Sequence, residues 1–191
     1  MVRWEPGTRE RLLTAALDLY AGQGFEQTTV ADIAAAAGVT ERTFFRHFAD
    51  KREVLFHGQD DLQRVFLEGL AAAPDHAPPM QMVTTALRAS TSFFDDERRP
   101  WSRRRQAVID ANPALRERES LKLRALAAAL AAALAARGVP EPTATLSAET
   151  GVTAFGVGFG IWIADGETRS FWQVEQDVLV ELGTLTAAVR R

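Results

Sequence analysis

The chain has 191 residues, among them no cysteine, one tyrosine, three histidines and two lysines. The absence of cysteine excludes a disulfide framework, a thiolate metal site and a cysteine nucleophile. So few histidine and tyrosine side chains, with no carboxylate pair marked by its spacing, leave few groups for acid–base or nucleophilic catalysis. We therefore expect a protein that is not an enzyme, with no catalytic residues, no metal site and no cofactor.

Long apolar runs are absent as well. The longest stretches without a charged residue, 125–136 and 150–164, are shorter than the roughly 18 residues that a membrane-spanning helix needs. The first residues also lack the basic region and apolar run of a signal peptide. Hydrophobic residues make up 47% of the chain and charged residues 25%, a composition typical of globular domains. These observations predict a soluble cytoplasmic protein.

Positive charge is also scarce, because 22 basic residues face 25 acidic ones and the formal net charge is −3. A strongly basic balance, typical of proteins that bind nucleic acid, is therefore missing from the chain as a whole. Any contact with nucleic acid must come from a local motif.

The pattern of apolar residues is helical throughout, since they recur at intervals of three and four and long alternating runs are absent. We predict an all-α fold of about nine helices, at 8–23, 30–37, 40–48, 50–70, 80–94, 101–111, 113–137, 143–164 and 170–190. We place a boundary inside the fourth helix. It divides the chain into a small first domain, 1–55, and a larger helical second domain, 56–191.

Three of these helices begin with a recognisable capping pattern. Thr29 and Asp32 form a capping box at the second helix, and Thr40 is placed to cap the third. Asp50 and Glu53 form the same box-like pattern at the start of the fourth helix, which we therefore expect to begin at Asp50.

The segment 28–51 has the anatomy of a helix-turn-helix, with two short helices on either side of Gly38. Ile33 and Phe44 belong to the faces that pack in the core. The outer face of the second helix, which we expect to contact DNA, carries Glu41, Arg42, Thr43 and Arg46. Arg42 has the geometry to reach two acceptors on a guanine edge in the major groove. The residues that we expect near phosphates, at or close to helix ends, are Thr28, Thr29, Thr40, His47 and Lys51.

The stretch 25–56 resembles the DNA-binding signature of the tetracycline-repressor-like (TetR) family of transcription regulators. Its most specific part is residues 43–48, Thr-Phe-Phe-Arg-His-Phe, followed by Lys51. Carried over by position, the resemblance places recognition-helix contacts on Thr43 and Phe45, backbone contacts on His47 and Lys51, and base-reading positions on Glu41 and Arg42. Two positions depart from the family pattern: Ala31 stands where many relatives have a polar residue, and Phe45 stands where tyrosine is common. Both departures affect affinity or operator choice.

The resemblance also implies a function for the second domain, namely binding of a small molecule and formation of a homodimer through the last two helices. The chain would then be a repressor that leaves a palindromic double-stranded operator when a ligand binds. Two recognition helices one helical turn apart fit a palindrome. The candidate pocket residues are Phe66, Phe94, Trp101, Arg105, Phe159 and Trp162. The candidate dimer residues are Gly151, Gly156, Gly158, Leu179, Leu182 and Leu185, with Val189 extending the last apolar stripe.

Several interpretations stay open at this point. The arginines between 98 and 105 form either a solvated helix face or, for one or two of them, a partner for an anionic ligand. The whole chain could instead be a helical ligand carrier or enzyme whose helix-turn-helix is idle. A third alternative is a DNA-binding regulator controlled by a protein partner rather than by a ligand.

Overall fold

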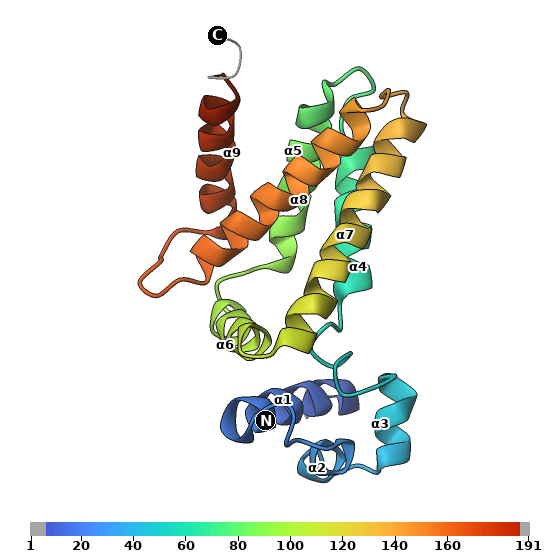
Figure 1. Ribbon diagram of the computed structural model, residues 1–191, viewed down its shortest axis with the longest axis vertical. Helices are drawn as coiled ribbons and strands as arrows, with labels where there is room; N and C mark the ends of the chain where they lie inside the picture. The colour runs from blue at the N-terminus through green and yellow to red at the C-terminus, as the bar shows by residue number, and fades with distance from the viewer. Residues whose placement is uncertain (1–6, 188–191) are drawn as a thin grey trace, which may run out of the picture. The chain divides into compact units, whose positions relative to one another are not determined.

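The computed structural model describes residues 7–187, and within that range the chain is helical with no strand (Figure 1). The helices are α1 (Thr8–Gln23), α2 (Val30–Ala36), α3 (Glu41–His47), α4 (Gln59–Ala71), α5 (Pro79–Ser90), the 3-10 turn η1 (Thr91–Phe93), α6 (Arg99–Asp110), α7 (Pro113–Ala136), α8 (Thr143–Trp162) and α9 (Phe171–Ala187). The prediction of an all-α fold with about nine helices is confirmed. None of these helices is long and apolar enough to cross a membrane.

The chain divides into two compact units. The first contains the residues up to Gly58 together with Arg104–Glu119, and the second contains Gln59–Arg103 and the chain from Ser120 onward. The helices α6 and α7 therefore each contribute residues to both units. The division into domains 1–55 and 56–191 stays a prediction.

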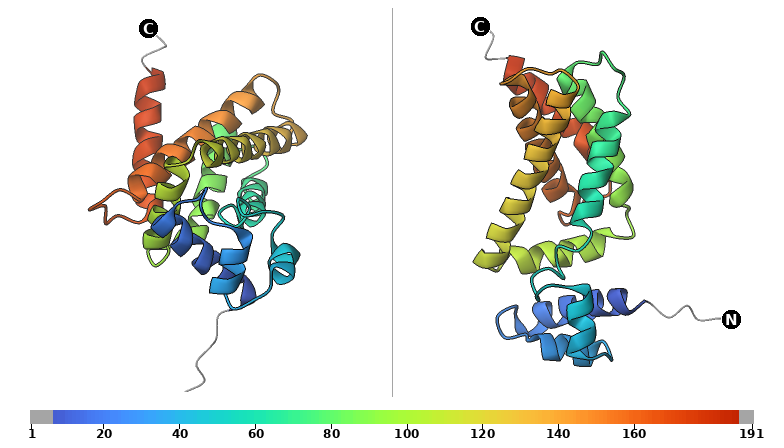
Figure 2. Two further views of the ribbon diagram at one scale, coloured as in Figure 1. Left: turned by 60° about the horizontal axis from the view of Figure 1, so that its bottom comes forward. Right: turned by 90° about the vertical axis from the view of Figure 1, so that its right-hand side faces the viewer.

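The first unit is built on α1, α2 and α3, which lie together in the views of Figures 1 and 2. Leu12 and Tyr20 from α1, Ile33 from α2 and Phe44 from α3 are all buried in one core. The later residues that complete this core are Val108, Ile109 and Leu115. Because α2 and α3 each bury only one side, their remaining positions stay at the surface.

The predicted caps of α2 and α3 are confirmed. The Thr29 side chain accepts a hydrogen bond from the Asp32 amide at 3.1 Å, and the Asp32 carboxylate accepts one from the Thr29 amide at 2.8 Å. Thr40 caps α3 by accepting a hydrogen bond from the Thr43 amide at 3.2 Å. Gly38 in the turn has φ +67°, a left-handed conformation that glycine adopts without steric cost.

The predicted start of the fourth helix at Asp50 is wrong, because α4 begins only at Gln59. The Asp50 carboxylate does accept hydrogen bonds from the following amides, but these bonds close a turn. The three consecutive residues 54–56 are all buried, which one face of a helix cannot achieve, and Gly58 has φ +89°, which ends any helical path. Glu53 binds Arg118 at 2.8 Å and does not complete a capping box.

The second unit has its own apolar core, formed by α4, α5, α8, α9 and the later part of α7. In Figures 1 and 2, α4 and α5 lie side by side, which agrees with their close packing. Gly69 makes this approach possible: a Cβ atom there would lie 2.9 Å from the Cα atom of Ala86 and 2.5 Å from the Cβ atom of Ala89. The backbones of α4 and α5 are therefore in contact at this level.

One further helix end differs from the predictions, and another cannot be compared. The fifth helix ends at Ser90 and continues only as the 3-10 turn, because the hydroxyl groups of Ser90, Thr91 and Ser92 donate to carbonyl oxygens within the last turn. The last helix is described to Ala187, so Val189 and the predicted end at residue 190 lie outside the described residues.

The arginines at the start of α6 hold the loop between α8 and α9. The buried Arg99 donates hydrogen bonds to the carbonyl oxygens of Glu167 and Arg169, the latter at 2.6 Å. Arg103 donates to the carbonyl oxygens of Ile163 and Ala164 at 2.6 and 2.8 Å. These two guanidinium groups therefore bind backbone carbonyls, which neither of the two interpretations from the sequence anticipated.

Candidate functional sites

Helix α3 presents a charged and apolar face to the surface. Phe44 lies fully buried, whereas Arg42, Phe45 and Arg46 are exposed, and the Phe45 side chain is 54% exposed. Residues three and four apart share a helix face, so Arg42, Phe45 and Arg46 stand together. Glu41 is exposed at the start of the same helix. This surface has the size and chemistry of a helix that enters the major groove of DNA.

The threonines near the helix ends differ in their exposure. Thr29 and Thr40 are exposed while their hydroxyl groups cap α2 and α3, and the half-buried Thr43 has its hydroxyl 3.1 Å from that of Thr40. Thr28, by contrast, is fully buried, and its hydroxyl donates to the carbonyl oxygen of Gly24 at 2.8 Å. The structure therefore does not bring Thr28 to the surface with the other three.

The ammonium group of Lys51 is held by backbone carbonyls. It donates hydrogen bonds to the carbonyl oxygens of Phe25, Glu26 and Thr28 at 2.8, 3.3 and 2.9 Å, and it lies 4.4 Å from the centroid of the Phe25 ring. An ammonium group has three hydrogens, and these bonds engage all of them. The phosphate contact expected of Lys51 stays a prediction, since it requires the group to leave these carbonyls.

His47 is half-buried at the end of α3. Its Nε2 atom is buried and has no hydrogen-bond partner among the described residues. Ala31, the position that departs from the family pattern, is exposed on α2. The helix-turn-helix thus keeps an outward surface around α3, while His47 is turned partly inward.

Arg105, another candidate pocket residue, belongs to the first unit. Its Nε atom donates to the carbonyl oxygen of Leu55 at 2.7 Å, its Nη1 atom pairs with Glu119 at 3.2 Å, and its guanidinium lies 5.2 Å from the Phe56 ring centroid. Burial lowers the pKa of this guanidinium, an effect that the carboxylate of Glu119 opposes. Arg105 therefore helps to hold the segment after α3.

Four of the six candidate pocket residues do gather in one aromatic cluster of the second unit. The cluster comprises Phe66, Phe93, Phe94, Phe155, Phe159, Trp162 and Phe171. Phe94 follows the 3-10 turn and contacts five of these rings at centroid distances of 5.2–5.9 Å. It is half-buried, as is Phe159, so the cluster reaches the surface there. Trp101 is exposed and is not part of this cluster.

Glu175 is a residue of this unit that the sequence analysis missed. It is 0% exposed, and neither carboxylate oxygen has a hydrogen-bond partner within residues 7–187. Burial raises the pKa of this carboxyl to about 7. Among the described residues, the indole nitrogen of Trp162 is also buried without a hydrogen-bond partner. One signal in the sequence could have indicated the burial of the glutamate: Glu175 stands one turn after Phe171, between the buried Val174 and the half-buried Val178.

The candidate dimer residues divide into buried and exposed ones. Gly151 and Gly158 are buried within the fold, whereas Gly156 is exposed and has open space around it. Leu185 is 61% exposed. Leu179 and Leu182 line a groove of about 380 Å³ between α5, α8 and α9. The exposed large apolar residues of α8 and α9 are Leu146, Val157, Ile161, Val180 and Leu185. Of these, only Leu185 is among the dimer residues predicted from the sequence.

A capped helix-turn-helix with arginines on its outer helix, joined to a separate helical unit with an aromatic cluster, defines a DNA-binding regulator. Comparison with known families agrees. The model for "Bacterial regulatory proteins, tetR family" matches residues 12–57, and the model for "MftR C-terminal domain" matches residues 77–177, more than half of the chain. The chain belongs to the tetR family of bacterial regulatory proteins, a family of regulators rather than enzymes.

The curated relatives are similar over part of their length. The HTH-type transcriptional regulator TcmR of Streptomyces glaucescens is 44% identical over 82 residues, which cover 43% of this chain and 36% of that protein. The HTH-type transcriptional repressor KstR2 of Rhodococcus jostii is 36% identical over 102 residues, covering 48% and 50%. The chain thus spans between a third and a half of the length of these two relatives.

Solved structures agree in fold. A transcriptional regulator from Rhodococcus sp. Rha1 has a TM-score of 0.55 and 21% identity, covering 94% of this chain and 96% of that one. The fatty acid degradation regulator FadR of Bacillus halodurans has a TM-score of 0.53 and 18% identity, covering 92% and 94%. At this identity the likeness concerns the arrangement of helices.

Proposed function

We propose that this protein is a sequence-specific repressor that binds a palindromic operator as a homodimer and leaves it when a small molecule binds. The observation that carries this proposal is the outer face of α3, where Arg42, Phe45 and Arg46 are exposed together in a chain of net negative charge. Positive side chains concentrated on one short helix fit local contact with DNA. We further propose that it acts in the cytoplasm, where its operator would be.

In the proposed complex, Arg42 and Glu41 read base edges, and Arg46 binds a phosphate. The bases that Arg42 favours are guanines, whose O6 and N7 atoms accept two hydrogen bonds from one guanidinium. Phe45 packs against sugar and phosphate, because it lacks a hydroxyl group. The residues that we propose to approach phosphates at helix ends are Thr29, Thr40, Thr43 and His47.

The proposed dimer forms through α8 and α9. Single exposed apolar side chains are common on monomeric proteins, but several of them close together favour an interface. The helices α8 and α9 carry four that are exposed, Val157, Ile161, Val180 and Leu185. Gly156 on the exposed side of α8 has space for a second helix to approach closely. A two-fold dimer would present two copies of α3, as a palindromic operator requires.

The proposed ligand site is the aromatic cluster around Phe94 and Trp162 in the second unit. Ligand sites in helical proteins are mostly apolar with a few polar groups, which describes this cluster. Release would be a population shift, in which the ligand prefers the conformation that cannot bind the operator. To change an operator-competent fraction from 99% to 1%, the ligand must prefer that conformation by roughly 10⁴-fold, which is about 5.5 kcal/mol.

Selection of bound duplexes from a random-sequence pool, at near-physiological salt, tests the DNA-binding proposal. We expect enrichment of one palindromic motif by the unaltered protein. The double variant Arg42→Ala and Arg46→Ala is the control, because both side chains are exposed and neither supports the core. Equal enrichment by the two proteins, or no motif from either, would contradict the proposal.

A further inference from the structure

The carboxyl group of Glu175 is the most unusual polar group in the second unit. Glu175 comes from α9, is 0% exposed, and has no hydrogen bond to either oxygen within the described part of the chain. Burying a carboxyl group without a partner is unfavourable, and buried polar groups in proteins are normally bonded. A group in this condition is a candidate for a partner that comes from outside the chain.

The fold makes room for this carboxyl group at Gly158. A Cβ atom at Gly158 would lie 2.9 Å from Oε1 and 3.0 Å from Cδ of Glu175, so a larger residue there would push the carboxyl group away. Glycine inside a helix is itself unfavourable. The glycine inside a helix and the buried carboxyl group without a partner each reduce stability, and the first makes space for the second. Such departures from the rules of stability are common at functional sites.

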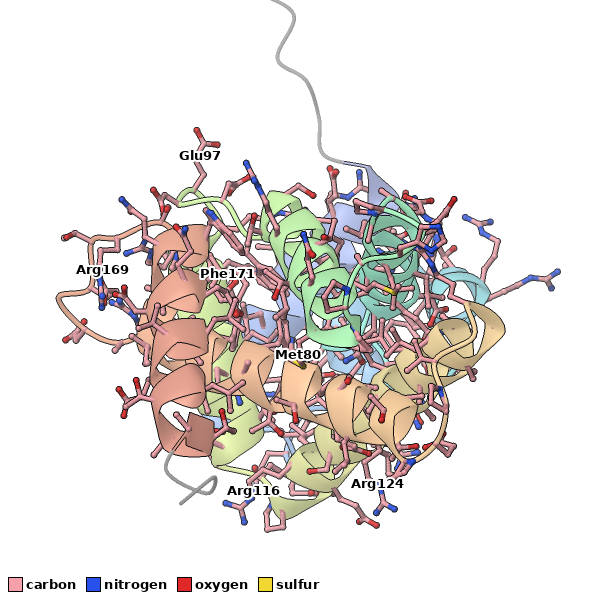
Figure 3. The ribbon with its side chains drawn as sticks, turned by 90° about the horizontal axis from the view of Figure 1, so that it is seen from above. Met80, Glu97, Arg116, Arg124, Arg169 and Phe171 are labelled. Carbon is pink, nitrogen blue, oxygen red and sulfur yellow. The ribbon has the colours of Figure 1, made fainter. Side chains whose placement is uncertain are left out.

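Aromatic rings border the pair. Phe171 precedes Glu175 by one turn of α9, and Phe155 and Trp162 lie one turn to either side of Gly158 on α8. The Phe171 ring lies 5.8 Å from that of Phe155 and 5.4 Å from that of Trp162. Figure 3 shows Phe171 on the side of α9 that faces α5 and α8. Aromatic faces attract cations, as a carboxylate does.

Three arginines contact the aromatic rings or the loop beside this region, and the buried Nε atom of one of them, Arg99, has no hydrogen-bond partner among the described residues. Arg88 lies over the ring of Trp172, Arg99 lies over Trp162 and bonds to backbone carbonyls, and Arg169 pairs with acidic side chains in the loop before α9. None of them donates a hydrogen bond to Glu175. In Figure 3, Arg169 lies in the loop on the far side of α9 from Phe171. The chain thus supplies aromatic faces and a buried carboxyl group to which no basic side chain among the described residues donates a hydrogen bond.

We propose that the small molecule bound by this protein carries a protonated amine, and that Glu175 is the residue that binds the amine. This inference rests on the proposed ligand response and adds the chemical class of the ligand, an apolar or aromatic body with one cationic nitrogen. The unpartnered Nε1 atom of Trp162 is available to an acceptor atom on the same molecule. The side chains of the cluster that reach the surface are the half-buried Phe94 and Phe159, so the proposed ligand would enter there.

Binding of three small probes of nearly equal size tests the inference: 1-naphthylmethylamine, which is cationic at pH 7, the neutral 1-naphthylmethanol, and the anion 1-naphthylacetate. We measure dissociation constants by calorimetry with the full chain. A charge-assisted hydrogen bond corresponds to roughly ten- to a hundredfold in affinity. We therefore expect the amine to bind at least about tenfold more tightly than the alcohol, and the anion to bind most weakly.

Two variants locate the effect. Glu175→Gln keeps the shape and removes the charge, so it should abolish the preference for the amine. Glu181→Gln, on the exposed side of the same helix, should leave the preference unchanged. Equal affinity for the three probes, or an amine preference that survives Glu175→Gln, overturns the inference. Operator binding is measured on the same samples, so a protein that binds DNA but not the amine refutes this inference alone.

Discussion

The hydroxyl group of Tyr20 donates a hydrogen bond of 2.6 Å to the carbonyl oxygen of Lys51. The side chain of Lys51 in turn donates to the carbonyl oxygens of the segment that leads into α2. Tyr20 belongs to α1, and Lys51 follows α3. Lys51 therefore connects three parts of the chain: its carbonyl group binds α1, its side chain binds the segment before α2, and its own position is just after α3.

Lys51→Met is expected to destabilise the protein, because it removes the three bonds to carbonyl oxygens while keeping an apolar stem. The expected loss is at least about 1.5–3 kcal/mol of unfolding free energy, the range for one hydrogen bond to a charged group. Denaturant unfolding measures it. If Lys51 also binds a phosphate, the variant will reduce the slope of log affinity against log salt by about one, whereas a purely supporting role leaves that slope unchanged.

Arg42→Ala is expected to relax the base preference at one position of each operator half-site. The loss of affinity for the preferred sequence should be roughly 1–3 kcal/mol, since the arginine contributes its two hydrogen bonds only with the right base. Arg64→Ala is a matched control, because Arg64 is exposed on α4 and pairs with Glu68. Fluorescence anisotropy with single-base variants of the operator measures both. An unchanged preference in Arg42→Ala would refute the assignment.

Glu175 is expected to make stability depend on pH. Burial raises the pKa of its carboxyl to about 7, so the folded chain keeps a proton that the unfolded chain has already lost at a lower pH. The unfolding free energy contributed by this group therefore falls as pH rises from about 4.5 to about 7, by about 3 kcal/mol in total. Glu175→Gln should lose this fall, and Glu181→Gln should keep it. Urea unfolding between pH 5 and pH 8 makes the comparison.

Gly69→Ala and Gly156→Ala are expected to have opposite effects, although both replace a glycine inside a helix. At Gly69 the new methyl group meets the backbone of α5, so we expect a loss of about 1–3 kcal/mol. At Gly156 no atom of the same chain lies within 4 Å, so in the dissociated monomer the higher helix propensity of alanine should add about 0.5–1 kcal/mol. Thermal unfolding at equal protein concentration shows both. Similar destabilisation by the two changes would contradict the packing described for α4 and α5.

Leu185→Glu is expected to weaken the proposed dimer, because it places a charge on an exposed apolar position of α9. Leu121→Glu is the control: Leu121 is 51% exposed on α7, away from the proposed interface. Sedimentation equilibrium gives the association constants, and we expect at least a tenfold loss for Leu185→Glu alone. Equal values for the two variants, or a monomer in the unaltered protein, would refute this interface.

The sequence was most informative where local signals decide the structure. The caps at Thr29 and Thr40 depend on contacts within four residues, and both were predicted correctly. The start of α4 was not, because tertiary packing buries residues 54–56 together and Gly58 adopts a positive φ that its neighbours do not reveal. Local rules therefore hold until burial by distant segments overrides them.

In the candidate sites, too, features set by local sequence were predicted, whereas features set by distant segments were not. The exposed positions of α3 could be inferred from helical periodicity once Phe44 was assigned to the core. Arg105 could not be placed, because its partners Leu55 and Glu119 are distant in sequence. Glu175 was not predicted to be buried, because a charged residue is normally expected at the surface. Its burial depends on the space at Gly158 on the neighbouring helix, and the sequence does not show that these two residues meet.

The contact at Gly69 has a mechanical consequence. Where the backbones of α4 and α5 touch, neither helix can slide or rotate against the other without steric overlap at Ala86. We therefore expect α4 and α5 to move together as one rigid body whenever the second unit changes shape. A change of shape in that unit would therefore have to involve parts outside this contact, such as the segment after the 3-10 turn or the exposed end of α9.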